Sequence, residues 1–103
     1  MRITWPTALV LAALRRGHGH GFQIIDVTGL RAGTVYPILR RLEADGMVRS
    51  SWERATQARV EGRPPRRNYR LTADGEALVN TALERYPGLP GVFGAAGGTE
   101  QPA

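Results

Sequence analysis

The side chains with the clearest chemistry in this chain are its arginines. All 14 basic residues among the 103 are arginine, against nine acidic residues, so the formal net charge is +5. A guanidinium presents a rigid fork of N–H donors that matches phosphate and the edge of guanine through paired hydrogen bonds. The arginines gather in two stretches, residues 31–41 and 54–70, and the second contains six arginines and one acid, Glu61. This pattern favours a polyanionic partner such as nucleic acid.

Residues suited to catalysis or metal binding are sparse by comparison. The chain has no cysteine, which removes disulfides, thiolate nucleophiles and cysteine-based metal sites. His18 and His20 stand in a glycine-rich loop without a third ligand nearby, whereas zinc sites need three or four protein ligands. His20 and Asp26, the one pair that suggests acid–base chemistry, do not share a face of a short helix. The sequence therefore predicts a binding protein without a cofactor or metal, not an enzyme.

Residues 31–46 are expected to form a helix that carries the first arginine group. At ~100° per residue, one side of this helix is an apolar stripe that must be buried. The stripe contains Val35, Ile38, Leu39 and Leu42. The opposite side contains Gly33, Pro37, Arg40 and Ala44, flanked by Tyr36 and Arg41. Because proline is harmless only in the first turn, Pro37 predicts that the regular helix starts near Gly33 or Thr34. We interpret this two-faced segment as a DNA-reading helix.

Two helices are expected before it. Residues 4–16 form the first, and its centre, residues 8–14, is apolar on every side. One side should face the core and the other a partner chain, with a central core helix as the alternative. Residues 22–27 form the second helix, with Phe22 and Ile25 directed inward and Ile24 as a further inward candidate. Helix, turn and helix at this spacing predict a helix-turn-helix.

A pair of strands joined by a basic loop is expected next. Loosely alternating side chains predict strands over residues 47–53 and 67–71, with Trp52 assigned to the core. The loop between them is long and polar, and Pro64 and Pro65 stiffen its backbone beside arginine. After a helix-turn-helix, such a hairpin is a wing. The arginines that this wing presents are Arg63, Arg66 and Arg67.

The last expected helix follows Thr72 as its N-cap and stops at Pro87. Its apolar stripe contains Leu78, Val79, Ala82, Leu83 and Tyr86. Residues 1–86 are therefore assigned to one DNA-binding and dimerisation domain, and residues 87–103, rich in glycine and proline, to a disordered tail. The longest apolar run falls short of the ~20 residues that span a bilayer, and no signal peptide is visible. A cytoplasmic protein without a membrane partner is expected.

The stretches GTVYPILRRLEADGMV and GRPPRRNYRLTADG closely resemble the PadR family of bacterial transcriptional regulators. The resemblance covers roughly residues 8 to 80 and includes the His-Gly-aromatic sequence that starts at His20. It implies an α+β, mostly α fold, a winged helix-turn-helix that forms a homodimer through its first helix and a single C-terminal dimerisation helix. It also implies a sequence-specific regulator of a pseudo-palindromic double-stranded DNA operator. Members are usually repressors that lose DNA affinity when a small-molecule effector binds.

The resemblance also implies roles for residues by position. The DNA-binding set is Thr34, Tyr36, Arg40, Arg41, Arg63, Arg66 and Arg67. Within it, Tyr36 either donates to a phosphate or packs half-buried on the wing, and Arg41 has an ion pair with Asp45 as its alternative. The implied dimer interface contains Leu9, Ala13, Leu78, Val79, Ala82, Leu83 and Tyr86.

Two further alternatives concern the partner of the chain. Trp5, with Tyr86 or Phe93, is a candidate wall for a flat aromatic effector at the dimer interface, and simple packing is its alternative role. A winged-helix module that docks on another protein without reading DNA is the competing function, and the arginine-rich wing argues against it. RNA binding is disfavoured because the motif shows no aromatic platform on which unpaired bases stack.

Overall fold

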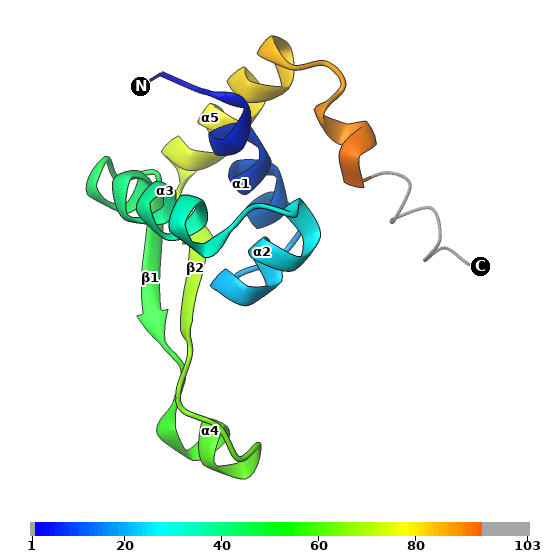
Figure 1. The fold of residues 1–103 in the computed structure, drawn as a ribbon. Coiled ribbons are helices and arrows are strands. Elements are labelled where there is room, and N and C mark those ends of the chain that lie inside the picture. The colour runs from blue at the N-terminus through cyan, green and yellow to red at the C-terminus, as the bar shows by residue number, and fades with distance from the viewer. Residues whose placement is uncertain (1, 94–103) are drawn as a thin grey trace, which may run out of the picture.

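The computed structural model describes residues 2–93, which form a helical body from which a long β-hairpin projects (Figure 1). The elements in chain order are α1 (Trp5–Arg15), α2 (Gly21–Thr28), α3 (Ala32–Ala44), β1 (Val48–Trp52), α4 (Ala55–Val60), β2 (Arg67–Leu71) and α5 (Ala73–Arg85). The expected mostly helical α+β class is confirmed, and so is the helix-turn-helix followed by a wing. Among the described residues, no helix is long and apolar enough to cross a membrane.

Side chains at the helix ends explain most of these boundaries. The Thr72 hydroxyl accepts a hydrogen bond from the backbone N–H of Gly75 at 3.0 Å, so it caps α5 as expected. Gly29 ends α2 in the left-handed conformation, with φ at +73°, which glycine adopts at little cost. These local signals are readable in the sequence because each acts within one helical turn.

The predicted start of α3 is wrong. The helix begins at Ala32, because the carbonyl of Arg31 already accepts from the N–H groups of Thr34 and Val35, at 2.9 Å each. Pro37 therefore lies in the second turn, inside the helix, and not in the first. The exposed position of Pro37 lets water reach the carbonyl that loses its N–H partner, so the helix continues past it.

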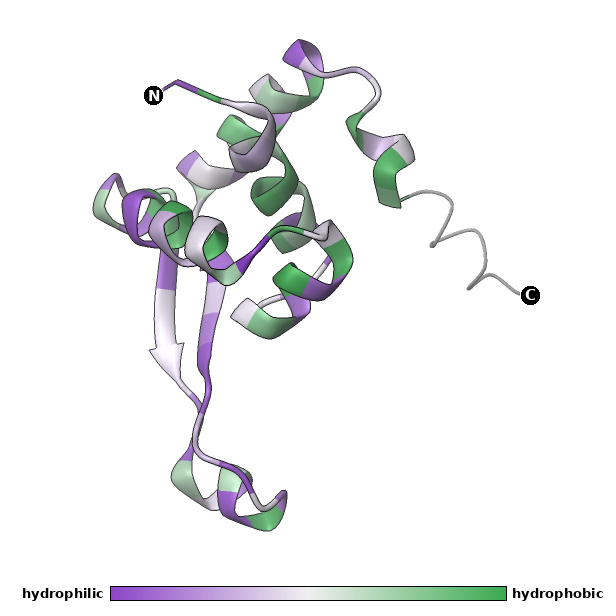
Figure 2. Cartoon of the chain, in the orientation of Figure 1, coloured by the Kyte–Doolittle hydropathy of each residue, from purple (hydrophilic) through white to green (hydrophobic). Residues whose placement is uncertain are grey.

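The core of the body is built around α1. Its residues 8–14 are at most 8% exposed, and α2, α3, α5 and β2 pack around them. Figure 2 shows this apolar helix enclosed by the other elements of the body. Leu89 and Phe93, in the tail, are also buried in this core, at 0% and 4% exposure. Within one chain α1 is thus a central core helix, and its apolar sides do not by themselves require a partner.

The packed part of the chain extends beyond the boundary expected at Tyr86. Residues 89–93 form a helical turn that carries Leu89 and Phe93 onto the core. The guanidinium of Arg16 lies over the Phe93 ring, 5.6 Å from its centroid. The remainder of the tail, residues 94–103, lies outside the described residues.

The wing is an antiparallel pair of strands in which Val48 lies opposite Leu71 and Trp52 opposite Arg67. The strand expected over residues 67–71 is confirmed, but the connection is not a simple loop, because α4 forms at its far end (Figure 1). The other edge of β2 is held by the glycine-rich loop before α2, where the carbonyl of Gly19 accepts from the N–H of Tyr69 at 2.7 Å. This contact fixes the start of α2 beside the base of the wing.

Candidate nucleic-acid interface

One face of α3 is exposed to solvent because the apolar side chains on its opposite face are packed in the core. Val35, Leu39 and Leu42 are fully buried, as predicted, and Ile38 is half-buried beside them. The exposed side carries Arg40 and Arg41, and an ion pair of Arg41 with Asp45 does not form within the described part of the chain. Both guanidinium groups are therefore available to an anion.

The N-terminal turn of α3 adds polar groups to the same face. Thr34 is half-buried in this turn, and no side chain caps the helix at Arg31. Uncapped N–H groups at a helix N-terminus carry a partial positive charge and suit a phosphate oxygen. The first turn of α3 therefore offers backbone donors next to the arginines.

Tyr36 packs against the start of α2, and its side chain is 36% exposed. A Cβ added at Gly21 would lie 2.5 Å from Cε1 of Tyr36, closer than real Cβ atoms approach a neighbour. An alanine at this position would therefore force the Tyr36 ring to move. Tyr36 thus lies between the helix-turn-helix and the wing, and its ring remains exposed at the surface.

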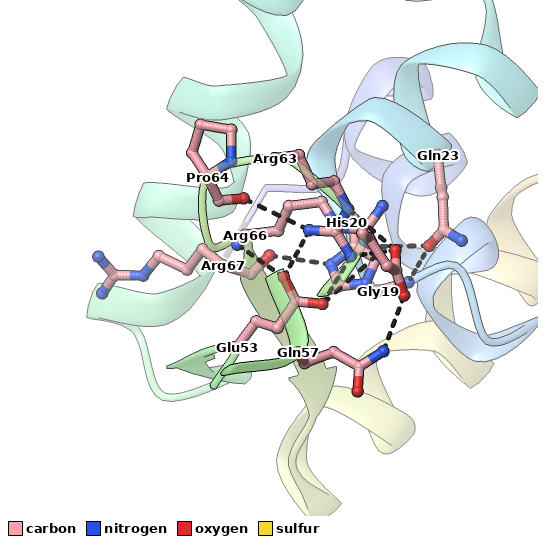
Figure 3. A network of polar contacts seen from close by, with 10 residues as sticks. Gly19, His20, Gln23, Glu53, Gln57, Arg63, Pro64, Arg66 and Arg67 are labelled. Atoms are coloured by element: carbon pink, nitrogen blue, oxygen red, sulfur yellow. Dashed lines mark hydrogen bonds and ion pairs between the residues drawn. The ribbon is translucent and has the colours of Figure 1, made fainter. Parts of the chain in front are cut away.

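The tip of the wing is organised around one carboxylate, that of Glu53. Arg63 donates to both of its oxygens, at 2.5 and 2.7 Å, and also donates to Glu61 at 2.7 Å. Figure 3 shows these groups converging, with the backbone N–H of Arg66 donating to the same Glu53 carboxylate at 3.2 Å. The Arg63 guanidinium holds the pKa of Glu53 down at about 2 and lowers that of Glu61. The two carboxylates in turn raise the pKa of Arg63.

Arg63, which was predicted to contact DNA, has its guanidinium engaged by carboxylates of the wing. Every nitrogen of its guanidinium donates to a carboxylate, and its side chain is only 22% exposed. Its charge is compensated where it stands, so Arg63 shapes the wing instead of presenting a free cation. The prediction missed this because Glu53 precedes the arginine-rich stretch by one residue.

Arg66 and Arg67 keep most of their donor capacity. Their ion pairs, with Glu53 and Glu43 respectively, are long at 3.7 Å, and the two side chains are 38% and 42% exposed. Nε of Arg66 is buried without an acceptor among the described residues, and Nε of Arg67 donates to the hydroxyl of Ser50 at 2.9 Å, so the terminal nitrogens are the donors left for a phosphate. These two arginines are the wing cations that a phosphate can reach.

Two aromatic residues assigned to the core by sequence lie at the surface instead. Phe22 is 74% exposed, because α2 turns Ile24 inward in its place. Trp52 is 65% exposed and lies under the guanidinium of Arg67, 5.3 Å from it. Both predictions were wrong, and both residues stand on the side of the molecule where the wing meets α2 and α3.

The residues implied in a dimer interface divide into two groups. Leu9, Ala13, Val79 and Ala82 are buried within the chain itself, and Leu78, Leu83 and Tyr86 keep some surface. Trp5, the candidate effector wall, packs edge to face on Tyr86 with ring centroids 5.3 Å apart. The Tyr86 hydroxyl donates to the carbonyl of Ile3 at 3.3 Å, so this aromatic pair is anchored inside one chain.

The histidine loop has a structural role in what the structure describes. Nδ1 of His20 lies 3.3 Å from the carbonyl oxygen of Arg67, which ties the loop to the wing. Within residues 2–93, no group of three or more His, Asp or Glu side chains is placed to hold a metal ion.

Comparisons with known proteins agree with this arrangement. The model of the transcriptional regulator PadR-like family matches residues 10–81, more than half of the chain. The fold is similar to that of a PadR family transcription regulator from hypervirulent Clostridium difficile R20291, with a TM-score of 0.70 and 18% identity over 89% of this chain and 97% of that one. It is also similar to a PadR-like transcription factor from Bacteroides fragilis, with a TM-score of 0.65 and 24% identity over 87% of each chain. A search of curated protein sequences found no significant match.

A third similar structure is that of BpsR from Bordetella bronchiseptica, described for the regulation of its DNA binding by 6-hydroxynicotinic acid. It has a TM-score of 0.67 and 24% identity, and the match covers 89% of this chain and 66% of BpsR. At such identities the likeness to solved structures concerns the fold alone.

Proposed function

This chain belongs to the PadR-like family of transcriptional regulators, and we propose that it regulates transcription by binding double-stranded DNA through α3 and the wing. The matched family and the similar structures are those of transcriptional regulators, not of enzymes. The proposed contacts are Thr34, Tyr36, Arg40, Arg41, Arg66 and Arg67. Arg63 is left out of this set because its charge is already compensated.

One observation carries the proposal. Tyr36 of α3 and Arg66 and Arg67 of the wing line the same surface depression, so the recognition helix and the wing present one continuous face. A helix in the major groove with a basic hairpin beside it requires such continuity, because both must meet one duplex together. The arginines of α3 then read guanine or hold phosphate, and those of the wing hold the adjacent backbone or enter the minor groove.

A homodimer and a pseudo-palindromic operator complete the proposal. Two copies would place their α3 helices in successive major grooves, with half-site centres ~34–36 Å apart or a multiple of that. The surface left by Leu78, Leu83 and Tyr86 is where we expect the second copy to pack, around the buried residues of α1 and α5. We further propose that the chain is a repressor whose DNA affinity falls when a small molecule binds beside Trp5 and Tyr86.

The test is DNA binding by the purified chain. Fluorescence anisotropy with a random-sequence duplex at low salt should show binding, and selection from a randomised library should then enrich an inverted repeat. A control duplex with the enriched half-sites scrambled should bind more weakly, at a level set by phosphate contacts alone. Absence of binding even to random duplex at low salt would reject the proposal and favour the protein-docking alternative.

A further inference from the structure

A depression of about 320 Å³ lies where the wing joins the helix-turn-helix, and its walls are aromatic. The rings come from four different elements. They are Phe22 of α2, Tyr36 of α3, Trp52 of β1 and Tyr69 of β2. The sequence did not reveal such a platform, because these residues are far apart in the chain and two of them were assigned to the core.

The exposure of these rings indicates a ligand. Phe22 and Trp52 are 74% and 65% exposed, although each would gain more by burial than almost any other side chain. Tyr69, in contrast, is half-buried, and burial raises the pKa of its hydroxyl. Exposed apolar surface that gathers in one place, and is not scattered singly, marks a binding site.

The positive charge around the rings indicates that the ligand carries an anionic group. Arg66 and Arg67 line the depression, and among the residues described as lining it none carries a carboxylate. The carboxylates that pair with these arginines lie 3.7 Å away, so the terminal nitrogens can still turn to an anion. Nε of Arg67 is already used by Ser50, and its guanidinium lies over the Trp52 ring. Flat apolar walls beside two cations fit a planar ring joined to an anionic group, which is the chemistry of a nucleotide.

We propose that this depression holds an unpaired nucleotide of a DNA strand, with its base stacked on Trp52 or Phe22 and its phosphate on Arg66 or Arg67. The depression is continuous with the face proposed for duplex binding, so under the proposed function a strand of DNA would lie beside it. A paired base cannot enter, because both of its faces are stacked in the duplex. The chain would therefore bind single strands, or duplexes with a bulged nucleotide, through an activity separate from reading a paired operator.

The experiment measures base-dependent binding to a single strand. Trp5→Phe leaves Trp52 as the one tryptophan, so its fluorescence reports on the depression. The ligands are a thymidine oligomer of about eight nucleotides and an abasic strand of the same length and charge. Stacking should quench Trp52 with the thymidine strand, which should bind more tightly than the abasic strand by about 5- to 150-fold.

Substitutions locate the effect in the depression. In anisotropy measurements with labelled strands, at least one of the variants Phe22→Leu and Trp52→Leu should remove most of the preference for thymidine over abasic DNA. Val60→Ala, which changes an exposed apolar side chain outside the depression, should keep it. Because Phe22 and Trp52 are mostly exposed, both variants should keep the unfolding midpoint of the parent.

Several results would overturn the inference. Equal affinity for the thymidine and abasic strands would show that no base stacks on the protein. An unchanged preference for thymidine in both Phe22→Leu and Trp52→Leu would show that the base stacks outside the depression. Saturation by dTMP at concentrations where the strand does not bind would assign the depression to a free nucleotide. Duplex binding, measured in parallel, separates the two proposals. A chain that binds duplex without base preference on single strands refutes only this inference, and the reverse result refutes only the proposed function.

Discussion

The salt dependence of DNA binding distinguishes the arginines that meet phosphate from the one that builds the wing. Four arginines that lack a short ion pair in the described part of the chain lie on the proposed face, namely Arg40, Arg41, Arg66 and Arg67. If each neutralises one phosphate, log K falls against log salt with a slope of about −3.6 per chain and about −7 per dimer. Between 50 and 200 mM salt the dimer would then lose affinity by about 10⁴-fold.

The substitution Arg40→Gln removes one of these contacts from each chain. The slope should become shallower by about 0.9 per chain, so the dimer should lose only about 10³-fold over the same range. Removing Arg63 together with its partner, as Glu53→Gln/Arg63→Gln, should leave the slope unchanged, because that cation is compensated before DNA arrives. Fluorescence anisotropy on one duplex at several NaCl concentrations measures all three slopes.

Either half of this prediction can fail. If Arg40→Gln leaves the salt slope unchanged, Arg40 does not contact a phosphate of the DNA. A double variant whose slope becomes shallower by one contact per chain places Arg63 on a phosphate, against the geometry of its ion pairs. Circular dichroism melts of each variant provide the control, since a partly unfolded wing would lower affinity without a defined change in slope.

Three further predictions concern stability and the arrangement of the site. Leu89→Ala should lower the free energy of unfolding by about 2–5 kcal/mol, because Leu89 is fully buried in the core; a urea-unfolding loss below about 1 kcal/mol would contradict the packing of residues 89–93. Gly21→Ala should weaken both folding and DNA binding, because the added Cβ would displace Tyr36; a variant with the melting temperature and affinity of the parent would show that the ring yields freely. The stability difference between the parent and Glu53→Gln should be constant above pH 4.5, the usual carboxyl pKa, and should be lost as the pH falls towards the native pKa of about 2; a loss already complete at pH 4.5 in urea-unfolding experiments would refute the lowered pKa.

Local signals in the sequence predicted much of the fold. Thr72 caps its helix through an atom three residues away, and the alternation of residues 67–71 identifies a strand without knowledge of its partner. The predictions of burial failed where a side chain is buried only if the helical body reaches as far as that residue. Val48 and Trp52 share one face of β1, four residues apart, but only Val48 lies over the body, at 1% exposure. The hairpin carries Trp52 beyond the core, which alternation alone does not indicate.

In the candidate site, too, features set by nearby residues were predicted and features set by distant residues were not. The exposed arginines of α3 follow from the helical period, since the opposite stripe had to be buried. The role of Arg63 depends on Glu53, ten residues earlier, which only the antiparallel pairing of the hairpin brings beside it. A count of arginines along the sequence therefore overestimated how many wing arginines are free of a short ion pair. The short helix α4 was missed because, within its six residues, Ala58 alone is buried, and one position gives no periodic signal.

The wing uses one residue type for two purposes, and the distance to carboxylates decides between them. Arg63 lies within 2.7 Å of two acids and is mostly covered, so separating it would leave carboxylates without their donors. Arg66 and Arg67 lie 3.7 Å from theirs and are more exposed, so exchanging a weak carboxylate contact for a phosphate costs little. The fixed ion pairs at the tip thus hold the hairpin in the shape that brings the two loosely paired arginines, and the rings beside them, to the face shared with α3.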